Sequence, residues 1–370
     1  MNTKKPGAKG GEFEERLRSY FAHAGFLAIR SVPFFFEGDE VSDVDVWLYE
    51  RPNAIARRRT IVDAKNKQRP KAVERILWVK GFQIGLKIDG AIVATTDRRP
   101  GIKKFASSLG ISVLDGDALE RLIAAQRLED EGRLSHEDLF DTFSRADSER
   151  SNREWAERLA HGKSSLLSNF GFLSANYNLE NARFFAEAGA SPNRERARAA
   201  ARAFLLSCCF AAASLDFAAK DLGFRSVEER RENLILGLRF GETGGVSTLE
   251  MVNLALGLVR QYAENGTAIS KQVETRFLRD AARIRVEIVA EYVSKIINRE
   301  NLFQISRELD RYAFDSAIPQ YDDFSIDLKS FLSVVLDSFE INRKILNQLF
   351  PATPANLELQ FSEEADKTQS

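Results

Sequence analysis

The sequence predicts an α/β domain with a mixed sheet in the first third of the chain and an all-α domain in the rest. Up to residue 126, one helix pattern precedes three consecutive strand patterns, after which helix and strand patterns alternate. This order gives a mixed sheet with helices on both faces. After residue 127 the strand patterns stop, and capping signals such as Ser226-Val227-Glu228-Glu229 precede long helical stretches.

Each element of the first domain follows from a local pattern. Phe13, Leu17 and Phe21 recur at helical spacing before Gly25, which predicts the first helix. Pro33 marks the first strand as bent or placed at a sheet edge. The elements expected in chain order are a helix at 12–24, strands at 26–36, 42–49 and 59–67, a helix at 71–87, a strand at 90–96, a helix at 100–109, a strand at 111–114 and a helix at 117–126.

The length of 370 residues allows two domains, and the charge differs between the two parts. Residues 1–126 carry 22 Lys and Arg against 16 Asp and Glu, whereas the net charge of the whole chain is −1. A basic first domain suits contact with nucleic acid. The predicted organisation is a flexible arm at 1–11, the α/β domain at 12–126, a linker at 127–150, an all-α domain at 151–350 with helices at about 151–168, 193–220, 246–264, 269–298 and 322–349, and a disordered tail at 351–370.

The two cysteines, Cys208 and Cys209, are adjacent in the most apolar stretch of the chain. Adjacent cysteines rarely pair with each other, which indicates a reducing compartment. The stretch 203–219 is interrupted by Asp216, so a buried helix is favoured over a membrane span. Because the N-terminus also has no apolar secretory run, the sequence predicts a cytoplasmic protein with no membrane partner.

Acidic residues gather on two of the predicted strands. The strand at 59–67 places Asp63 and Lys65 two residues apart, so both project from one face. In the preceding strand Asp43 and Asp45 alternate with valines and form another acidic face. Two such strands side by side would form a carboxylate cluster able to hold a divalent cation.

The pattern Asp45 followed by Asp63-Ala64-Lys65 resembles the signature of the PD-(D/E)xK nuclease superfamily. The stretch Gly11-Glu12-Phe13-Glu14 resembles the first-helix motif of its Mrr-like and restriction-endonuclease-like branch. The resemblance covers roughly residues 10–125 and implies an αβββαβ core. It also implies that Glu14, Asp45 and Asp63 bind metal, that Lys65 helps activate water, and that the protein acts in restriction or phage defence.

Phosphodiester hydrolysis by Mg²⁺ or Mn²⁺ would suit these residues. Asp45, Asp63 and the carbonyl of Ala64 form a minimal oxygen anchor, to which Glu14 could add a ligand. Alternatively, Glu14 is a first-turn acid favoured by the helix dipole. Asp63 and Lys65 could likewise form a mere ion pair in a catalytically inactive fold that binds nucleic acid or serves assembly. Further candidates are Asp43 and Gln83, although Gln83 is more simply an exposed polar residue.

Basic residues flank the two strands and could bind the phosphates of DNA, or of RNA. A solvated loop explains the same residues equally well. The helical region shows no catalytic constellation, and we expect it to form an independently folded bundle that mediates a homodimer or contacts a partner protein. The predicted nucleic-acid-binding residues are Arg57, Arg58, Arg59, Lys67, Arg69 and Lys71.

Overall fold

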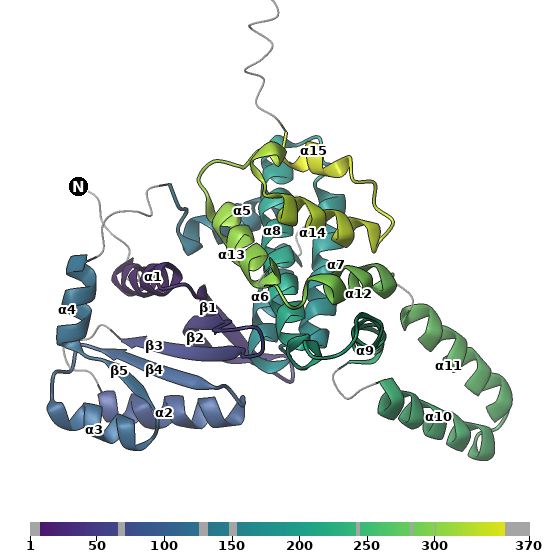
Figure 1. The fold of residues 1–370 in the computed structure, drawn as a ribbon, viewed down its shortest axis with the longest axis horizontal. Helices are drawn as coiled ribbons and strands as arrows, with labels where there is room; N and C mark the ends of the chain where they lie inside the picture. Colours follow the sequence, from purple (N-terminus) through teal and green to yellow (C-terminus); the bar gives the residue numbers. More distant parts are fainter. Residues whose placement is uncertain are drawn as a thin grey trace, which may run out of the picture.

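A computed structural model describes residues 8–65, 71–125, 132–147, 154–241, 245–281, 284–299 and 301–351. The N-terminal part holds a five-stranded mixed sheet, and a mostly helical region follows it (Figure 1). The elements of the N-terminal part are α1 (Ala8–His23), β1 (Leu27–Phe36), β2 (Asp39–Glu50), β3 (Arg58–Lys65), α2 (Ala72–Gly85), β4 (Gly90–Thr95), α3 (Pro100–Ser108), β5 (Ser112–Leu114) and α4 (Gly116–Ala125).

The strands follow one another in the sheet in the order β1-β2-β3-β4-β5. The first three are antiparallel neighbours, whereas β3, β4 and β5 run parallel. A two-residue turn joins β1 to β2, and both its residues, Glu37 and Gly38, have positive φ (51° and 96°). This conformation matches the twist of a hairpin. The parallel strands need longer crossovers, which α2 and α3 supply.

Helices cover both faces of the sheet, as the order of elements predicts. On one face, Phe13, Leu17 and Phe21 of α1 and Leu119 of α4 pack with Val62 and its neighbours. On the other face, α2 and α3 lie against the same strands (Figure 1). This second layer extends without a break into the core of the helical region.

Helix boundaries in the helical region differ from those predicted. The expected helix at 269–298 is two helices, and the one at 322–349 ends at Asp337, shortly before Glu340 adopts a positive φ of 58°. Residues 127–150, predicted to be a linker, contain α5. The helices are α5 (His136–Asp147), α6 (Glu154–Ser168), α7 (Phe172–Ala188), α8 (Arg194–Ala218), α9 (Val227–Phe240), α10 (Gly245–Tyr262), α11 (Gly266–Ala281), α12 (Val286–Ile296), α13 (Asn301–Phe314), α14 (Ile326–Asp337) and α15 (Ile345–Leu349), with 3₁₀ turns at Lys220–Leu222 and Tyr321–Asp323.

Helix α8 is the centre of the helical region (Figure 1). By length and composition it could cross a membrane, but its most apolar 18-residue window is wholly buried by the rest of the protein. Cys208 and Cys209 lie within this helix and are free and buried. The apolar stretch is therefore a core helix in this structure, as the sequence favours.

A buried charge cluster joins α8 to the sheet. Asp216 accepts hydrogen bonds from the hydroxyl of Tyr49 at 2.6 Å and from Nη1 of Arg51 at 2.8 Å. Nε of Arg57 lies 2.7 Å from the same carboxylate. The rings of Tyr49 and Phe170 pack edge to face nearby, with centroids 5.2 Å apart. Such a shared core argues against a helical region that folds on its own.

Candidate functional site

The structure brings together two of the predicted acids, Asp45 and Asp63. Val46 of β2 and Val62 of β3 form the last pair of this antiparallel ladder, and continuing the register by one residue on each strand brings Asp45 towards Asp63. Opposed residues have Cβ atoms about 5 Å apart. Each aspartate is only 5% exposed. Oδ2 of Asp45 also accepts a hydrogen bond from the backbone N–H of Ala64 at 2.6 Å, so the two strands are tied at this point.

Among the described side chains, Arg75 of α2 supplies a cation at this site, and the sequence prediction missed it. Its Nε donates to Oδ2 of Asp63 at 2.9 Å, and its Nη2 contacts Oδ1, so the pair is bidentate. Its Cζ lies 4.4 Å from the ring centroid of Trp78. Burial lowers the pKa of Arg75, although Asp45 and Asp43 oppose this shift. Arg75 therefore lies in the field of three aspartates.

Helical spacing contained a signal for Arg75. The buried face of α2 includes Ala72, Ile76 and Val79. Residue 75 is three positions after Ala72 and four before Val79, so it lies on the edge of that face. A basic residue there, in the first turn after the acidic strand, points back towards the sheet.

The C-terminal end of β3, where Lys65 and further basic residues follow Asp63, is only partly within the described residues. The backbone of Lys65 ends β3 opposite Thr95 of β4. The side chain of Lys65 lies outside the described part of the chain, as do Lys67 and Arg69. Lys71, just before α2, is exposed and forms an ion pair with Glu74 at 3.0 Å.

Glu14 lies on α1, where Nε of Arg30 donates to its Oε2 at 3.1 Å. Arg30 also donates to both carboxylate oxygens of Glu137 on α5, at 3.1 and 2.6 Å. Burial alone would lower the pKa of Arg30, but Glu137 and Glu14 hold it above its usual value. Glu14 is thus partly neutralised by a cation of β1 that also links the sheet to the helical region.

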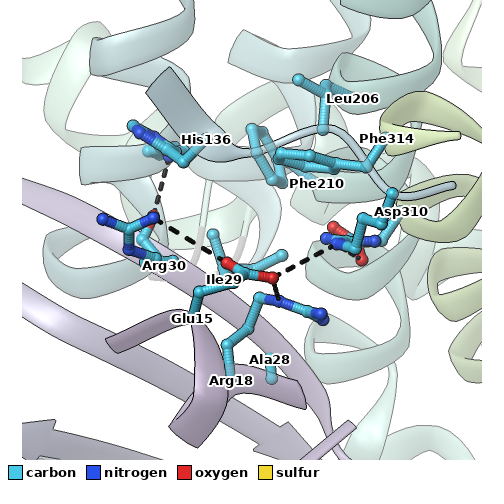
Figure 2. A pocket seen from close by; sticks show the side chains of 12 residues that line it. Glu15, Arg18, Ala28, Ile29, Arg30, His136, Leu206, Phe210, Asp310 and Phe314 are labelled. Carbon is cyan, nitrogen blue, oxygen red and sulfur yellow. Dashed lines mark hydrogen bonds and ion pairs between the residues drawn. The ribbon is translucent and has the colours of Figure 1, made fainter. Parts of the chain in front are cut away.

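Figure 2 shows the small cavity beside Arg30, about 10 Å³ in volume. Nζ of Lys163 lies 2.7 Å from Nε2 of His136 and donates to the carbonyl of Arg30 at 2.8 Å. Burial, together with the charge of Arg30, lowers the pKa of Lys163 to about 7. Burial and the charge of Lys163 lower that of His136 to about 2, so His136 is a neutral acceptor. This cluster is a junction between sheet and helices, and its cavity has room for about one water molecule.

The arginines at 57–59 do not lie beside the acids. They are at the start of β3, and Arg58 is five residues, or about 17 Å, before Asp63. Arg57 is buried against Asp216, so this residue is not available to bind phosphate. Arg58 is exposed and lies 3.6 Å from Glu50, and Nη2 of Arg59 donates to a backbone carbonyl.

Gln83 and Asp43 have different surroundings. Gln83 is buried rather than exposed, and its amide donates to the carbonyl of Asp89 at 3.3 Å. Asp89 precedes β4, which starts beside the start of β3, so Gln83 is at the opposite end of the strands from Asp63. Asp43 is exposed and close enough to Arg75 to affect its pKa.

The residues at the acid end fit a hard divalent cation. Carboxylate and carbonyl oxygens are the ligands that Mg²⁺ takes, and it commonly keeps several waters. Asp43, Asp45 and Asp63 together carry more negative charge than Arg75 neutralises. Within the described residues, no group of three or more His, Cys, Asp or Glu side chains is arranged to hold a metal. The oxygens that would hold a metal there belong to Asp45, Asp63 and the Ala64 carbonyl, and a metal would have to displace Arg75 from Asp63.

Comparison with protein-family models, curated proteins and solved structures finds no significant match.

Proposed function

We propose that this protein is a metal-dependent endonuclease that hydrolyses DNA phosphodiester bonds and has a restriction-endonuclease-like αβββαβ core. One observation carries the proposal: Asp45 and Asp63 lie directly beyond the last pair of the β2–β3 ladder, Val46 with Val62, and Lys65 ends β3 two residues later. The spacing resembles the PD-(D/E)xK signature. On that resemblance we also propose a role in restriction or phage defence, in the cytoplasm.

Each residue of the site has a chemical role in this proposal. Asp45, Asp63 and the carbonyl of Ala64 would hold Mg²⁺ or Mn²⁺, which neutralises charge on the phosphate and polarises water. Lys65 orients the attacking water or takes its proton, because a neighbouring cation favours the neutral form of an amine. Asp45 is kept in position by the N–H of Ala64. Glu14 is a candidate further ligand once it leaves Arg30.

The test is cleavage of plasmid and linear DNA with Mg²⁺, with Mn²⁺ and with EDTA. We expect cleavage with either metal and none with EDTA, and we expect Asp63→Ala and Lys65→Ala to abolish it. Asp221→Ala, a change at an exposed aspartate far along the chain, is the matched control. Cleavage that survives both site substitutions would refute the enzyme. Duplex, single-stranded, branched and RNA substrates in the same assay define the substrate.

A second candidate function is supported by the pairing of Asp63 with Arg75. Arg75 engages both carboxylate oxygens of Asp63, the atoms that a metal would need. A site held in this way would suit a catalytically inactive protein of this fold that binds nucleic acid or serves assembly. Titration calorimetry with Mg²⁺ separates the two, because the inactive protein would bind DNA without binding metal at this site.

We also propose that two copies associate through the hairpin of α10 and α11, which projects from the body of the helical region (Figure 1). A stripe of exposed apolar side chains runs along α10 at spacings of three or four residues. The hairpin face is about 27 Å long and 20 Å wide, or roughly 540 Å², which is about two thirds of the ~800 Å² per partner in a standard-size interface. One active-site motif per chain also favours a pair for cutting two strands. The exposed large apolar residues described on α10 are Met251, Leu254, Leu258 and Tyr262.

Light scattering on the whole protein tests whether two copies of the chain associate. We expect a dimer that becomes monomeric in the variant Leu254→Glu/Leu258→Glu. Ile326→Glu, at an even more exposed apolar residue on α14, should leave the dimer intact. A monomeric wild-type protein would refute the proposed pair.

A further inference from the structure

The helical region contains a large open groove that the proposed active site does not use. It lies between the end of α5, the start of α8, the segment after α13 and the end of α15, and has a volume of about 1270 Å³. Gly189 forms part of the wall of the groove. The backbone at Gly189 packs directly against Leu349 of α15, because a Cβ atom on residue 189 would overlap the Leu349 side chain. The groove is larger than the ~300–1,000 Å³ of usual small-molecule sites.

The groove is strongly cationic. One glutamate, Glu195, is its single acidic side chain among the described lining residues. Three arginines recur at every fourth position of α8, so they lie along one side of that helix. The start of a 25-residue helix adds partial positive charge at the same end. The lining arginines are Arg145, Arg194, Arg196, Arg198 and Arg202.

Arg202 forms the buried base of this row. It is 6% exposed, and its guanidinium donates to the backbone carbonyls of Ala313, Asp315 and Ser316. Burial lowers its pKa, and Arg198 adds to this effect while Asp315 opposes it. The acceptors of its hydrogen bonds are neutral backbone carbonyls, so these bonds fix the guanidinium without cancelling its charge.

Arg194 and Arg198, one and two turns before Arg202, are exposed at the mouth of the groove. Among the residues that the structure describes, neither forms an ion pair with a carboxylate. An exposed arginine elsewhere in the chain does: Arg343 pairs with Asp337. The mouth of the groove thus carries positive charge at Arg194 and Arg198 that no carboxylate of the described chain pairs with.

The lining favours phosphate over bases as the feature that is recognised. Guanidinium groups match phosphate oxygens with paired hydrogen bonds. Recognition of single-stranded bases relies on aromatic stacking. The described lining residues are polar, charged or aliphatic and include no aromatic ring.

We propose that this groove binds a nucleic-acid strand by its phosphate backbone, independently of sequence, through Arg194, Arg198 and Arg145. The identification of the ligand as a nucleic acid rests on the proposed nuclease function. The prediction that the groove binds anions rests on its arginines alone. The groove would then hold substrate at a distance from Asp45 and Asp63, and would replace the phosphate contacts predicted for Arg57.

The test measures binding separately from cleavage. Fluorescence anisotropy of a labelled DNA duplex is recorded in EDTA at several salt concentrations, with the wild-type protein and with Arg194→Glu/Arg198→Glu. We expect the double variant to bind at least about tenfold more weakly and to reduce the salt slope by about 0.9 for each phosphate that is no longer neutralised. The control, Arg225→Glu/Arg231→Glu beyond the other end of α8, changes the net charge equally and should retain most of the affinity.

Thermal melting checks that both variants fold. If Arg194→Glu/Arg198→Glu does not fold, the neutral variant Arg194→Gln/Arg198→Gln takes its place. Equal loss of affinity in the groove and control variants would overturn the proposal. So would saturable binding of inorganic triphosphate that depends on Arg194 and Arg198 in a protein that binds no DNA. Groove-dependent DNA binding without cleavage would uphold the groove and refute the nuclease, so the two proposals fail separately.

Discussion

Asp216 at the junction and Asp63 at the end of β3 are both buried aspartates paired with arginine. Asp216 is enclosed by two guanidinium groups, of Arg51 and Arg57, whose side chains are 1% exposed. Asp63 pairs with Arg75, whose side chain is 30% exposed, and it lies near Asp45 of the neighbouring strand. The first site is closed and has more cation than anion. Among the described side chains, the second has one partly exposed arginine in the field of three aspartates, an arrangement that suits an external cation.

The largest effect should come from breaking the closed site. Asp216→Ala leaves two guanidinium groups buried without a carboxylate, and the free energy of unfolding should fall by about 3–5 kcal/mol. Urea denaturation followed by tryptophan fluorescence measures it, since Trp47 is buried near this junction. Asp221→Ala, at an exposed position, should stay within about 0.5 kcal/mol of wild type. A decrease of less than about 1 kcal/mol at Asp216 would mean that solvent reaches the cluster.

Breaking the open site should affect activity far more than stability. Asp63→Asn keeps a hydrogen-bond acceptor for Arg75, which can also reach solvent, so unfolding should change by no more than about 1 kcal/mol. Cleavage should fall by about two orders of magnitude or more, the usual scale for losing one electrostatic group at a reaction centre. Denaturation and cleavage are measured on the same preparation. A stability loss as large as that of Asp216→Ala would show that Asp63 is structural.

A second junction cluster makes stability depend on pH. The pKa of Lys163 is about 7 in the folded protein, below its ordinary 10.5. Between these values the unfolded chain binds more protons, so stability should rise with pH, by at most about 1.4 kcal/mol per unit. Below pH 7, Lys163 is protonated in both the folded and the unfolded protein, so its contribution to the free energy of unfolding no longer changes with pH. The charged or titratable groups around Lys163 are Arg30, His136, Glu137, Glu15 and Asp310.

Comparison with Lys163→Met isolates this contribution, because the other groups titrate in both proteins. Urea denaturation at pH 7, 8 and 9 should show the wild type gaining stability relative to the variant at each step. His136 stays neutral throughout this range, since its pKa is about 2. A difference that is constant with pH would show that Lys163 is not held in its neutral form.

The sequence predicted the sheet better than the helical region for physical reasons. The strands carry short local patterns, alternation of aspartates with valines in β2 and a brief apolar run in β4, and Gly25 and Pro100 mark the neighbouring helices. Helix α7 escaped prediction because buried asparagines interrupt its apolar face. One of them, Asn178, lies so close to Gly162 of α6 that a Cβ atom on residue 162 would overlap the Asn178 side chain.

The site was predictable to the extent that it depends on local spacing. The opposition of Asp45 and Asp63 follows from two neighbouring strands, and Arg75 could have been found from helix periodicity. The burial of Arg57 could not, because its partner Asp216 is 159 residues away and only the packing of α8 on the sheet brings them together.

The smallest effect sharpens the difference between the two aspartates. Arg75→Gln removes the cation that covers both oxygens of Asp63, so a metal no longer has to displace it. A partly exposed ion pair contributes up to about 1 kcal/mol, so the Mg²⁺ concentration that gives half-maximal cleavage should fall about fivefold or less.

Lys80→Gln is the control for this change: it removes one charge from the same helix, but Lys80 contacts Gln83 rather than an aspartate. Its Mg²⁺ requirement should match the wild type. If Arg75→Gln requires more metal instead, Arg75 supports the site rather than competing for it. If neither metal binding nor cleavage occurs in the wild type or in Arg75→Gln, Asp63 and Arg75 form a structural pair like the one at Asp216, and the inactive binding protein becomes the better account of this fold.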